Sequence, residues 1–191
     1  MAGNSGNRGA RRGGSWRMAT WGGAAFLLLV PLVAMQLTDE MAWGPGDFIL
    51  LGAMLFGACG TFELAARMTG DGSYRAAVAV AVAAAFLIVW VNLAVGIIGS
   101  EDNRANLMFA GVLAVGLIGA VIARFQPHGM ARALVAMAIA QAVVAGVALV
   151  LGSLEGFVLS GGLVALWLLS AWLFRKAQGR QSPQVARPHA G

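Results

Sequence analysis

The chain has 191 residues, of which 59% are hydrophobic and 11% are charged, whereas a soluble domain is roughly 45 to 50% apolar and about 25% charged. This composition excludes an ordinary soluble globular domain. The net charge of +5 would favour nucleic-acid binding only if the basic residues gathered on one face, and they are spread along the chain instead. We therefore predict no nucleic-acid partner, and membrane lipids as the surroundings of the protein.

Apolar segments of membrane-crossing length follow one another along the chain. A hydrocarbon core about 30 Å thick requires roughly 20 apolar residues per helix. In lipid an open strand would leave its backbone groups unpaired, which favours helices throughout. The predicted helices span 18–37, 47–67, 76–98, 107–123, 133–151 and 157–174. The sequence thus predicts an all-α, polytopic transmembrane helical bundle of six spans.

The two ends of the chain differ from the middle in composition. Residues 1–17 and 177–191 are rich in Gly, Arg, Gln, Ser and Pro, which is typical of segments that cannot bury enough apolar surface to fold. We expect a disordered basic N-terminal tail, a single transmembrane domain over 18–176, and a disordered C-terminal tail.

Short polar connections separate the predicted spans. Residues 45–47 stop one segment and cap the next, as Asp71 and its neighbours do between the second and third spans. We expect Gly99 to end the third span, Asp102 or Asn103 to cap the fourth, and 127–129 to form the next loop. Such short loops make sequential helices antiparallel neighbours.

The basic residues sort onto one side of this six-span arrangement. Only Arg104 lies on the side opposite the N-terminus. The other 12 of the 13 basic residues are Arg8, Arg11, Arg12, Arg17, Arg67, Arg75, Arg124, Arg132, Arg175, Lys176, Arg180 and Arg187. Because short loops that carry Lys and Arg stay in the cytoplasm, we predict that both termini are cytoplasmic. We expect the first span to be a retained anchor, since it is longer than the roughly 7 to 15 apolar residues of a signal peptide.

Residues that hold cofactors and metals are scarce. The histidines, His128 and His189, fall in a loop and a tail, so they cannot hold a haem within the spans. Cys59 is the only cysteine, which excludes an internal disulfide and a thiolate metal cluster. We predict no cofactor and no metal, and an enzyme is the least favoured class of function.

Glu63, Asn92 and Gln141 are the strongest polar side chains within the spans, and they are the candidate site residues. An ionisable group inside a membrane is uncommon and often functional, so Glu63 is either a proton or cation site or the partner of Arg67 one turn away. For Asn92 and Gln141 the alternative is hydrogen bonding between helices. If all three face inward, they form a polar path across the bundle.

Small residues form stripes on the second and fourth spans. The first stripe contains Ala53, Gly57, Gly60 and Thr61, and the second contains Gly116, Gly119, Ala120 and Ala123. Such stripes let helix backbones approach closely, either within the bundle, in a homo-oligomer or against a membrane-protein partner.

A shift of 57 residues aligns spans two and three with spans four and five, placing Arg67 on Arg124 and Arg75 on Arg132. Either a duplicated helical hairpin or the shared alanine-rich composition explains this match.

The stretch Trp90 to Met108, which reads WVNLAVGIIGSEDNRANLM, resembles the central hairpin of a group of small uncharacterised bacterial integral membrane proteins. The resemblance continues into residues 65–67 and 122–125 and covers a little over half of the chain. It implies a multi-pass protein of the bacterial inner membrane and supplies no activity.

From the sequence we predict a structural or accessory membrane component. The alternative is a small transporter or channel in which Glu63, Gln141 and Asn92 line a polar path.

Overall fold

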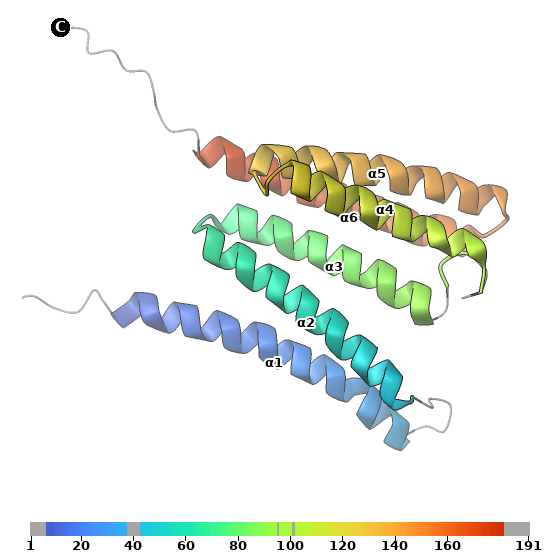
Figure 1. Ribbon diagram of the computed structural model, residues 1–191, viewed down its shortest axis with the longest axis horizontal. Coiled ribbons are helices and arrows are strands. Elements are labelled where there is room, and N and C mark those ends of the chain that lie inside the picture. The colour runs from blue at the N-terminus through green and yellow to red at the C-terminus, as the bar shows by residue number, and fades with distance from the viewer. Residues whose placement is uncertain (1–6, 38–42, 95, 101, 182–191) are drawn as a thin grey trace, which may run out of the picture. The chain divides into compact units, whose positions relative to one another are not determined.

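A computed structural model describes residues 7–37, 43–94, 96–100 and 102–181, and its regular elements are all helical (Figure 1). These elements are α1 (Asn7–Leu37), α2 (Pro45–Met68), α3 (Gly72–Ala94), the 3-10 turn η1 (Arg104–Asn106), α4 (Leu107–Ile122), α5 (Pro127–Val150) and α6 (Leu154–Gln181). None of the described residues forms a strand. The predicted all-α fold is therefore confirmed.

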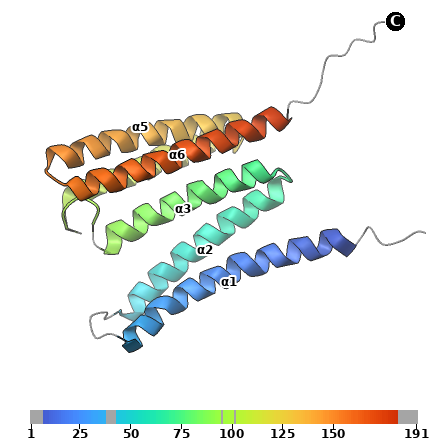
Figure 2. The same ribbon diagram turned by 180° about the vertical axis from the view of Figure 1, so that it is seen from behind.

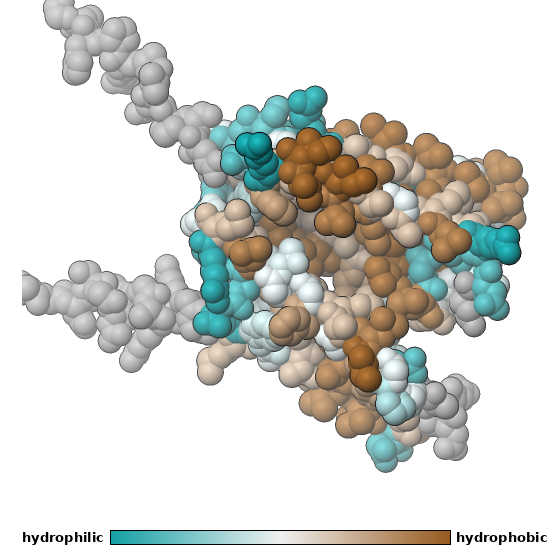
Figure 3. Space-filling model, in the orientation of Figure 1, coloured by the Kyte–Doolittle hydropathy of each residue, from teal (hydrophilic) through white to brown (hydrophobic). Residues whose placement is uncertain are grey.

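Six of the helices, searched over the described residues, are long and apolar enough to cross a membrane. This agrees with the number of spans predicted from the sequence, and the chain is a multi-pass membrane protein. On the face shown in Figure 3, hydrophobic side chains mainly cover the flank of α4, α5 and α6, while hydrophilic side chains lie near the ends of these helices. This distribution is the one that a bilayer requires.

The first and last helices extend beyond their predicted spans. Helix α1 begins at Asn7, so residues 7–17 belong to a helix and not to the predicted tail, and α6 continues to Gln181. An apolar window marks only the part of a helix that lies in lipid, whereas the backbone hydrogen bonds continue into water through Arg, Lys, Ala and Gln, which are good helix formers. Residues 1–6 and 182–191 lie outside the described residues.

Two of the predicted caps are present. Asp47 accepts a hydrogen bond from the Gly44 N–H at 2.8 Å, and its own N–H donates to the Gly44 carbonyl at 3.1 Å. At the start of α3, Asp71 Oδ1 accepts from the Tyr74 N–H at 2.9 Å. Each carboxylate satisfies an N–H group that the helix itself leaves without a partner.

The prediction that Gly99 ends the third span is wrong, because α3 ends five residues earlier at Ala94. The chain then turns through Gly96 and Gly99, whose φ angles are 73° and 72°. The N–H of Gly96 donates to the Val91 carbonyl at 3.0 Å and closes the last turn. Glycine adopts this left-handed conformation without the steric cost that other residues incur.

The prediction that 127–129 forms a loop is also wrong, because these residues are the first turn of α5. Pro127 stands where a helix tolerates proline best, since the N–H that it lacks would have no helical partner there. The connection is made instead by Arg124 and Phe125, whose φ angles are 48° and 58°, after α4 ends at Ile122.

The chain divides into two compact units, an N-terminal unit of residues 1–64 and a C-terminal unit of residues 65–191. In the C-terminal unit the closest packing joins α5 to α6, α3 to α6 and α4 to α5 (Figures 1 and 2). The helices thus follow one another in space in the order α3, α6, α5, α4.

Large side chains of α6 lie in the core of the C-terminal unit. Trp167 and Phe174 of α6 are 1% and 0% exposed. The ring of Phe174 meets Tyr74 edge to face at 5.0 Å, and the Ser170 hydroxyl donates to the Ala77 carbonyl at 2.7 Å. The last bond requires close approach of α3 and α6, which the small side chain of Ala77 permits.

The small-residue stripe of α4 packs against α5. A Cβ atom at Gly119 would lie 2.6 Å from the Cβ of Ala133, and one at Gly116 would overlap Met137. The stripe of α2 differs, because within the described N-terminal unit no other side chain lies within 4 Å of a Cβ position at Gly57 or Gly60.

Candidate functional site

Glu63 joins α2 to α1 within the N-terminal unit. Its Oε1 lies 3.0 Å from Nε of Arg17, and its Oε2 accepts a hydrogen bond from Trp21 Nε1 at 3.1 Å. The Glu63 side chain is 16% exposed and that of Arg17 is 64% exposed. The structure therefore adds two partners from α1 to the Arg67 neighbour that the sequence suggested.

The surrounding contacts place one face of α2 against α1. The rings of Trp21 and Phe56 meet edge to face at 5.4 Å, and the Cys59 thiol donates to the Thr20 carbonyl at 3.7 Å. The signal for this contact was present in the sequence, since Arg17 and Trp21 are spaced by four residues on one helix, as are Cys59 and Glu63 on the next.

The contacts of Glu63 with Arg17 and Trp21 join α2 to α1. A carboxylate that pairs with a guanidinium and accepts from an indole has its charge balanced and has a partner at each oxygen. Because Arg17 is mostly exposed, solvent screens the pair, and we expect it to contribute about 0 to 1 kcal/mol to stability.

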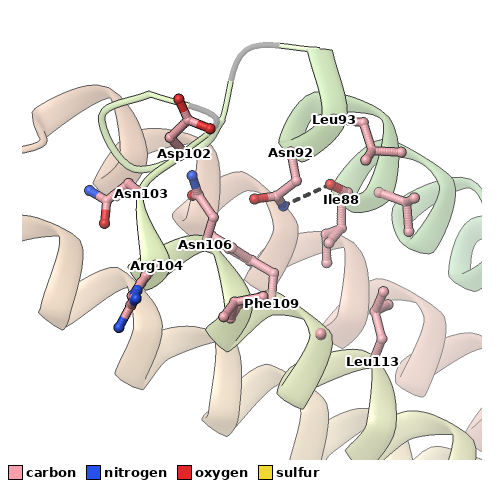
Figure 4. Close-up of a pocket in the computed structure, with 12 residues that line it drawn as sticks. Ile88, Asn92, Leu93, Asp102, Asn103, Arg104, Asn106, Phe109 and Leu113 are labelled. Carbon is pink, nitrogen blue, oxygen red and sulfur yellow. Dashed lines mark hydrogen bonds between the residues drawn. The ribbon is translucent and has the colours of Figure 1, made fainter. Parts of the chain in front are cut away.

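Asn92 lies in the C-terminal unit, where it lines a pocket of about 400 Å³ between α3 and the start of α4 (Figure 4). Its Nδ2 donates to the Ile88 carbonyl at 2.8 Å, within the same helix. Its Oδ1 is buried and has no partner among the described residues. Ile88 and Phe109, each 1% exposed, are the most deeply buried residues that line the pocket.

Asn106 holds the loop that forms the rim of this pocket. Its Oδ1 accepts from the N–H groups of Ile97 and Ile98 at 3.2 and 2.9 Å, and its Nδ2 donates to the Ser100 carbonyl at 2.8 Å. The Asn106 side chain thus supplies hydrogen-bond partners to backbone groups of the loop, which is not helical. Nearby, Asn103 Oδ1 accepts from the N–H of Ala105 at 3.0 Å and opens η1, which confirms one of the two predicted caps.

Two opposite charges, Asp102 and Arg104, lie on the same rim (Figure 4). Both residues are exposed. Among the residues that the structure describes, neither the carboxylate nor the guanidinium has a side-chain partner. The pocket therefore combines apolar walls, one unpaired amide oxygen and a pair of free charges at its mouth.

Gln141 lies in the core of the C-terminal unit and is 0% exposed. Neither its Nε2 nor its Oε1 has a hydrogen-bond partner in the described part of the chain, and the same holds for Ser160 Oγ and Trp167 Nε1. A buried polar atom without a partner costs about 1 to 3 kcal/mol. These unpaired groups therefore mark polar positions within an apolar core.

The register of α5 and α6 brings these three side chains to neighbouring levels. Helices α5 and α6 are antiparallel and are joined by the turn at 151–153. Gln141 is ten residues before this turn and Leu163 is ten residues after it, so the two residues lie at the same depth along the helices. Ser160 and Trp167 lie about one helical turn on either side of Leu163. The sequence indicated Gln141 but not Ser160 or Trp167, although these two share a face of α6 with Leu163 and Ser170.

Helix register places Ile88 and Phe109 between the depth of the Asn92 pocket and that of Gln141. Met137 of α5 lies against Gly116 of the antiparallel helix α4. One turn further along α5, Gln141 therefore lies at the same depth as Val112, which is one turn earlier on α4. Phe109 is about one turn from Val112 in the direction of the pocket. The polar groups of Asn92 and Gln141 are therefore separated by a layer of large apolar side chains. Glu63 belongs to the N-terminal unit, so a path through all three residues stays a prediction.

The described residues include no group of three or more His, Cys, Asp or Glu side chains able to hold a metal ion. Comparisons with protein-family models, with curated proteins and with solved structures find no match. The resemblance carried by 90–108 accordingly stays an expectation.

Proposed function

We propose that this protein is a structural or accessory component of the bacterial inner membrane. The observation that carries the proposal is the nature of the buried polar side chains in the C-terminal unit. In the described core these are Ser73, Gln141, Ser160 and Ser170, all of them uncharged. Of these, the Ser170 hydroxyl joins α6 to α3 through the Ala77 carbonyl, as neutral polar groups do between membrane helices, whereas proton and ion carriers use ionisable groups inside the bundle.

Association with another membrane protein, or with a second copy of the chain, fits an accessory role. The small-residue stripe of α2 supports this part of the proposal, because within the described part of the N-terminal unit no side chain approaches Gly57 or Gly60, and a helix backbone can pack there. The mass of the purified protein in mild detergent, and the proteins that purify with it, will identify such an assembly.

We further propose that both termini are cytoplasmic. The basic residues of the inner connections, Arg67, Arg75, Arg124 and Arg132, support this orientation, with Arg104 alone at the other end. A reporter that works only in the cytoplasm should be active when fused after Arg180, and one that works only outside should be active when inserted at Asp102. Activity of each reporter at the other position would exclude this orientation.

A small transporter of neutral solutes is the second candidate. The unpaired atoms of Gln141, Ser160 and Trp167 favour it, because such atoms can bind a polar solute. By helix register, a solute that moved from the Asn92 pocket to Gln141 would pass the buried side chains of Ile88 and Phe109. Apolar constrictions of this kind act as gates in membrane channels.

Flux measurements in liposomes separate these candidates. For an accessory protein we expect the rates of proton, cation and neutral-solute entry to equal those of empty liposomes. Glu63→Gln should leave these rates unchanged and lower the free energy of unfolding by at most about 1 kcal/mol, since the amide oxygen still accepts from Trp21.

Neutral-solute flux that stops when Gln141 is replaced would instead establish the second candidate. Cation flux that is lost in Glu63→Gln, with the folded yield unchanged, would show that Glu63 is an ion site and would contradict the proposal. Arg124→Gln, a change at an exposed charge in an inner connection, serves as the control for altered surface charge.

A further inference from the structure

The pocket between α3 and α4 opens on the apolar flank of the C-terminal unit. Leu93 and Leu107 line it and are 53% and 71% exposed, so its wall is continuous with the surface that faces acyl chains in a bilayer. Ile88 and Phe109 close the pocket on the side of the core, where both are buried. The cavity is therefore shaped for an apolar chain that enters from the membrane.

The polar groups of the pocket gather at the end of the spans, where lipid headgroups lie. Asp102 and Arg104 follow the end of α3 and precede α4, and both are exposed and lack side-chain partners among the described residues. A pair of opposite charges on one rim matches a headgroup that itself carries both charges and has no net charge.

Asn92 adds a hydrogen-bond acceptor to these charges. Its Oδ1 is buried without a described partner, while its Nδ2 donates to the Ile88 carbonyl, which as a helical carbonyl also accepts a backbone bond. The terminal torsion of asparagine is broad. Rotation of the amide therefore presents Oδ1 to a donor in the pocket while Ile88 keeps its helical bond.

We propose that this pocket binds a phospholipid whose headgroup is a phosphate ester with a primary ammonium group, that is, a phosphoethanolamine lipid. The phosphate lies near Arg104, and the ammonium donates to Asp102 and Asn92 Oδ1. One acyl chain lies over Leu93, Leu107 and Leu113. A primary ammonium supplies three N–H donors, whereas the trimethylated ammonium of a choline lipid supplies none.

The test compares lipids that share acyl chains and differ only in the headgroup. The intact protein in mild detergent is given equal amounts of phosphatidylethanolamine, phosphatidylcholine and phosphatidylglycerol, and bound lipid is counted by native mass spectrometry. We expect phosphatidylethanolamine to be retained about three- to tenfold more than the other two, the ratio that one or two hydrogen bonds supply. Equal retention of the ethanolamine and choline lipids would overturn the proposal.

Two further comparisons locate the site and its ligand. N-methylation of the ethanolamine lipid changes the ligand without any change to the protein: the N-monomethyl lipid keeps two N–H donors for the two acceptors and should be retained, whereas the dimethyl and trimethyl lipids should be retained progressively less. Asn92→Leu should abolish the preference for ethanolamine over choline, whereas Glu155→Gln, at an exposed carboxylate in the first turn of α6, should keep it. A preference that survives in Asn92→Leu would place the lipid elsewhere.

Glycerophosphoethanolamine, which has the headgroup and no acyl chains, separates a lipid from a soluble ligand. In large excess it should leave the bound lipid in place, because the apolar walls supply much of the contact. Displacement by this compound would show that the pocket recognises a free phosphoethanolamine ester and would contradict the lipid assignment.

Discussion

Gly119→Leu is expected to separate α4 from α5 and to destabilise the C-terminal unit. A Cβ atom at Gly119 would lie 2.6 Å from the Cβ and 3.3 Å from the Cα of Ala133, so neither a rotamer change nor a flexible side chain can relieve the overlap. Overpacking of a tight core costs about 1 to 3 kcal/mol, and a leucine at a backbone contact should lie at or above the upper end of this range. The loss is measured as a lower unfolding temperature in detergent.

Gly111→Leu is the matched control on the same helix. Gly111 is exposed, and within the described residues no other side chain lies within 4 Å of a Cβ position there. Leucine favours helix more than glycine does, so this variant should unfold at or slightly above the temperature of the original protein. Equal losses in Gly111→Leu and Gly119→Leu would mean that α4 does not depend on close contact with α5.

Gln141→Met is expected to stabilise the protein, and Gln141→Glu to prevent stable folding. Methionine has nearly the shape of glutamine and removes two buried polar atoms that lack described partners, which should raise the free energy of unfolding by about 1 to 3 kcal/mol. A carboxylate at the same fully buried position would be an unpaired charge among apolar side chains, at a cost of several kcal/mol. Unfolding in detergent and the folded yield report these two effects.

Gln126→Met provides the control, because Gln126 is exposed at the start of α5 and its side chain makes no capping bond. It should change the stability by less than about 0.5 kcal/mol. If Gln141→Met destabilises the protein, the amide is bonded to water or to a solute in the native state, and the case for a neutral-solute path becomes the stronger one.

The accessory role and the lipid site are independent proposals with separate tests. A lipid that fills the space between α3 and α4 would tie together the two helices that end the spatial order α3, α6, α5, α4. Its loss should therefore leave the α4–α5 contact at Gly119 intact. The Gly119 and Asn92 variants can accordingly be interpreted separately.

The sequence by itself determined the helical class, the number of spans and most of the caps. These features depend on local physics: an apolar run must form a helix in lipid, and Asp47 and Asp71 bond to N–H groups within three residues of themselves. The last residue of α3, Ala94, and the first residue of α5, Pro127, were not predicted. An apolar run indicates where the lipid ends, whereas a helix ends where its backbone hydrogen bonds end.

Only the tertiary structure decided the partners of the polar residues. Glu63 meets Arg17 and Trp21, which lie more than forty residues away in the chain. Gln141 lies at the depth of Leu163, between Ser160 and Trp167, because α5 and α6 form an antiparallel pair. Asn92 lines a pocket because α3 and α4 leave space there. Hydropathy reports how each side chain partitions into lipid, whereas these contacts depend on the register and rotation of packed helices, which small differences in side-chain shape determine.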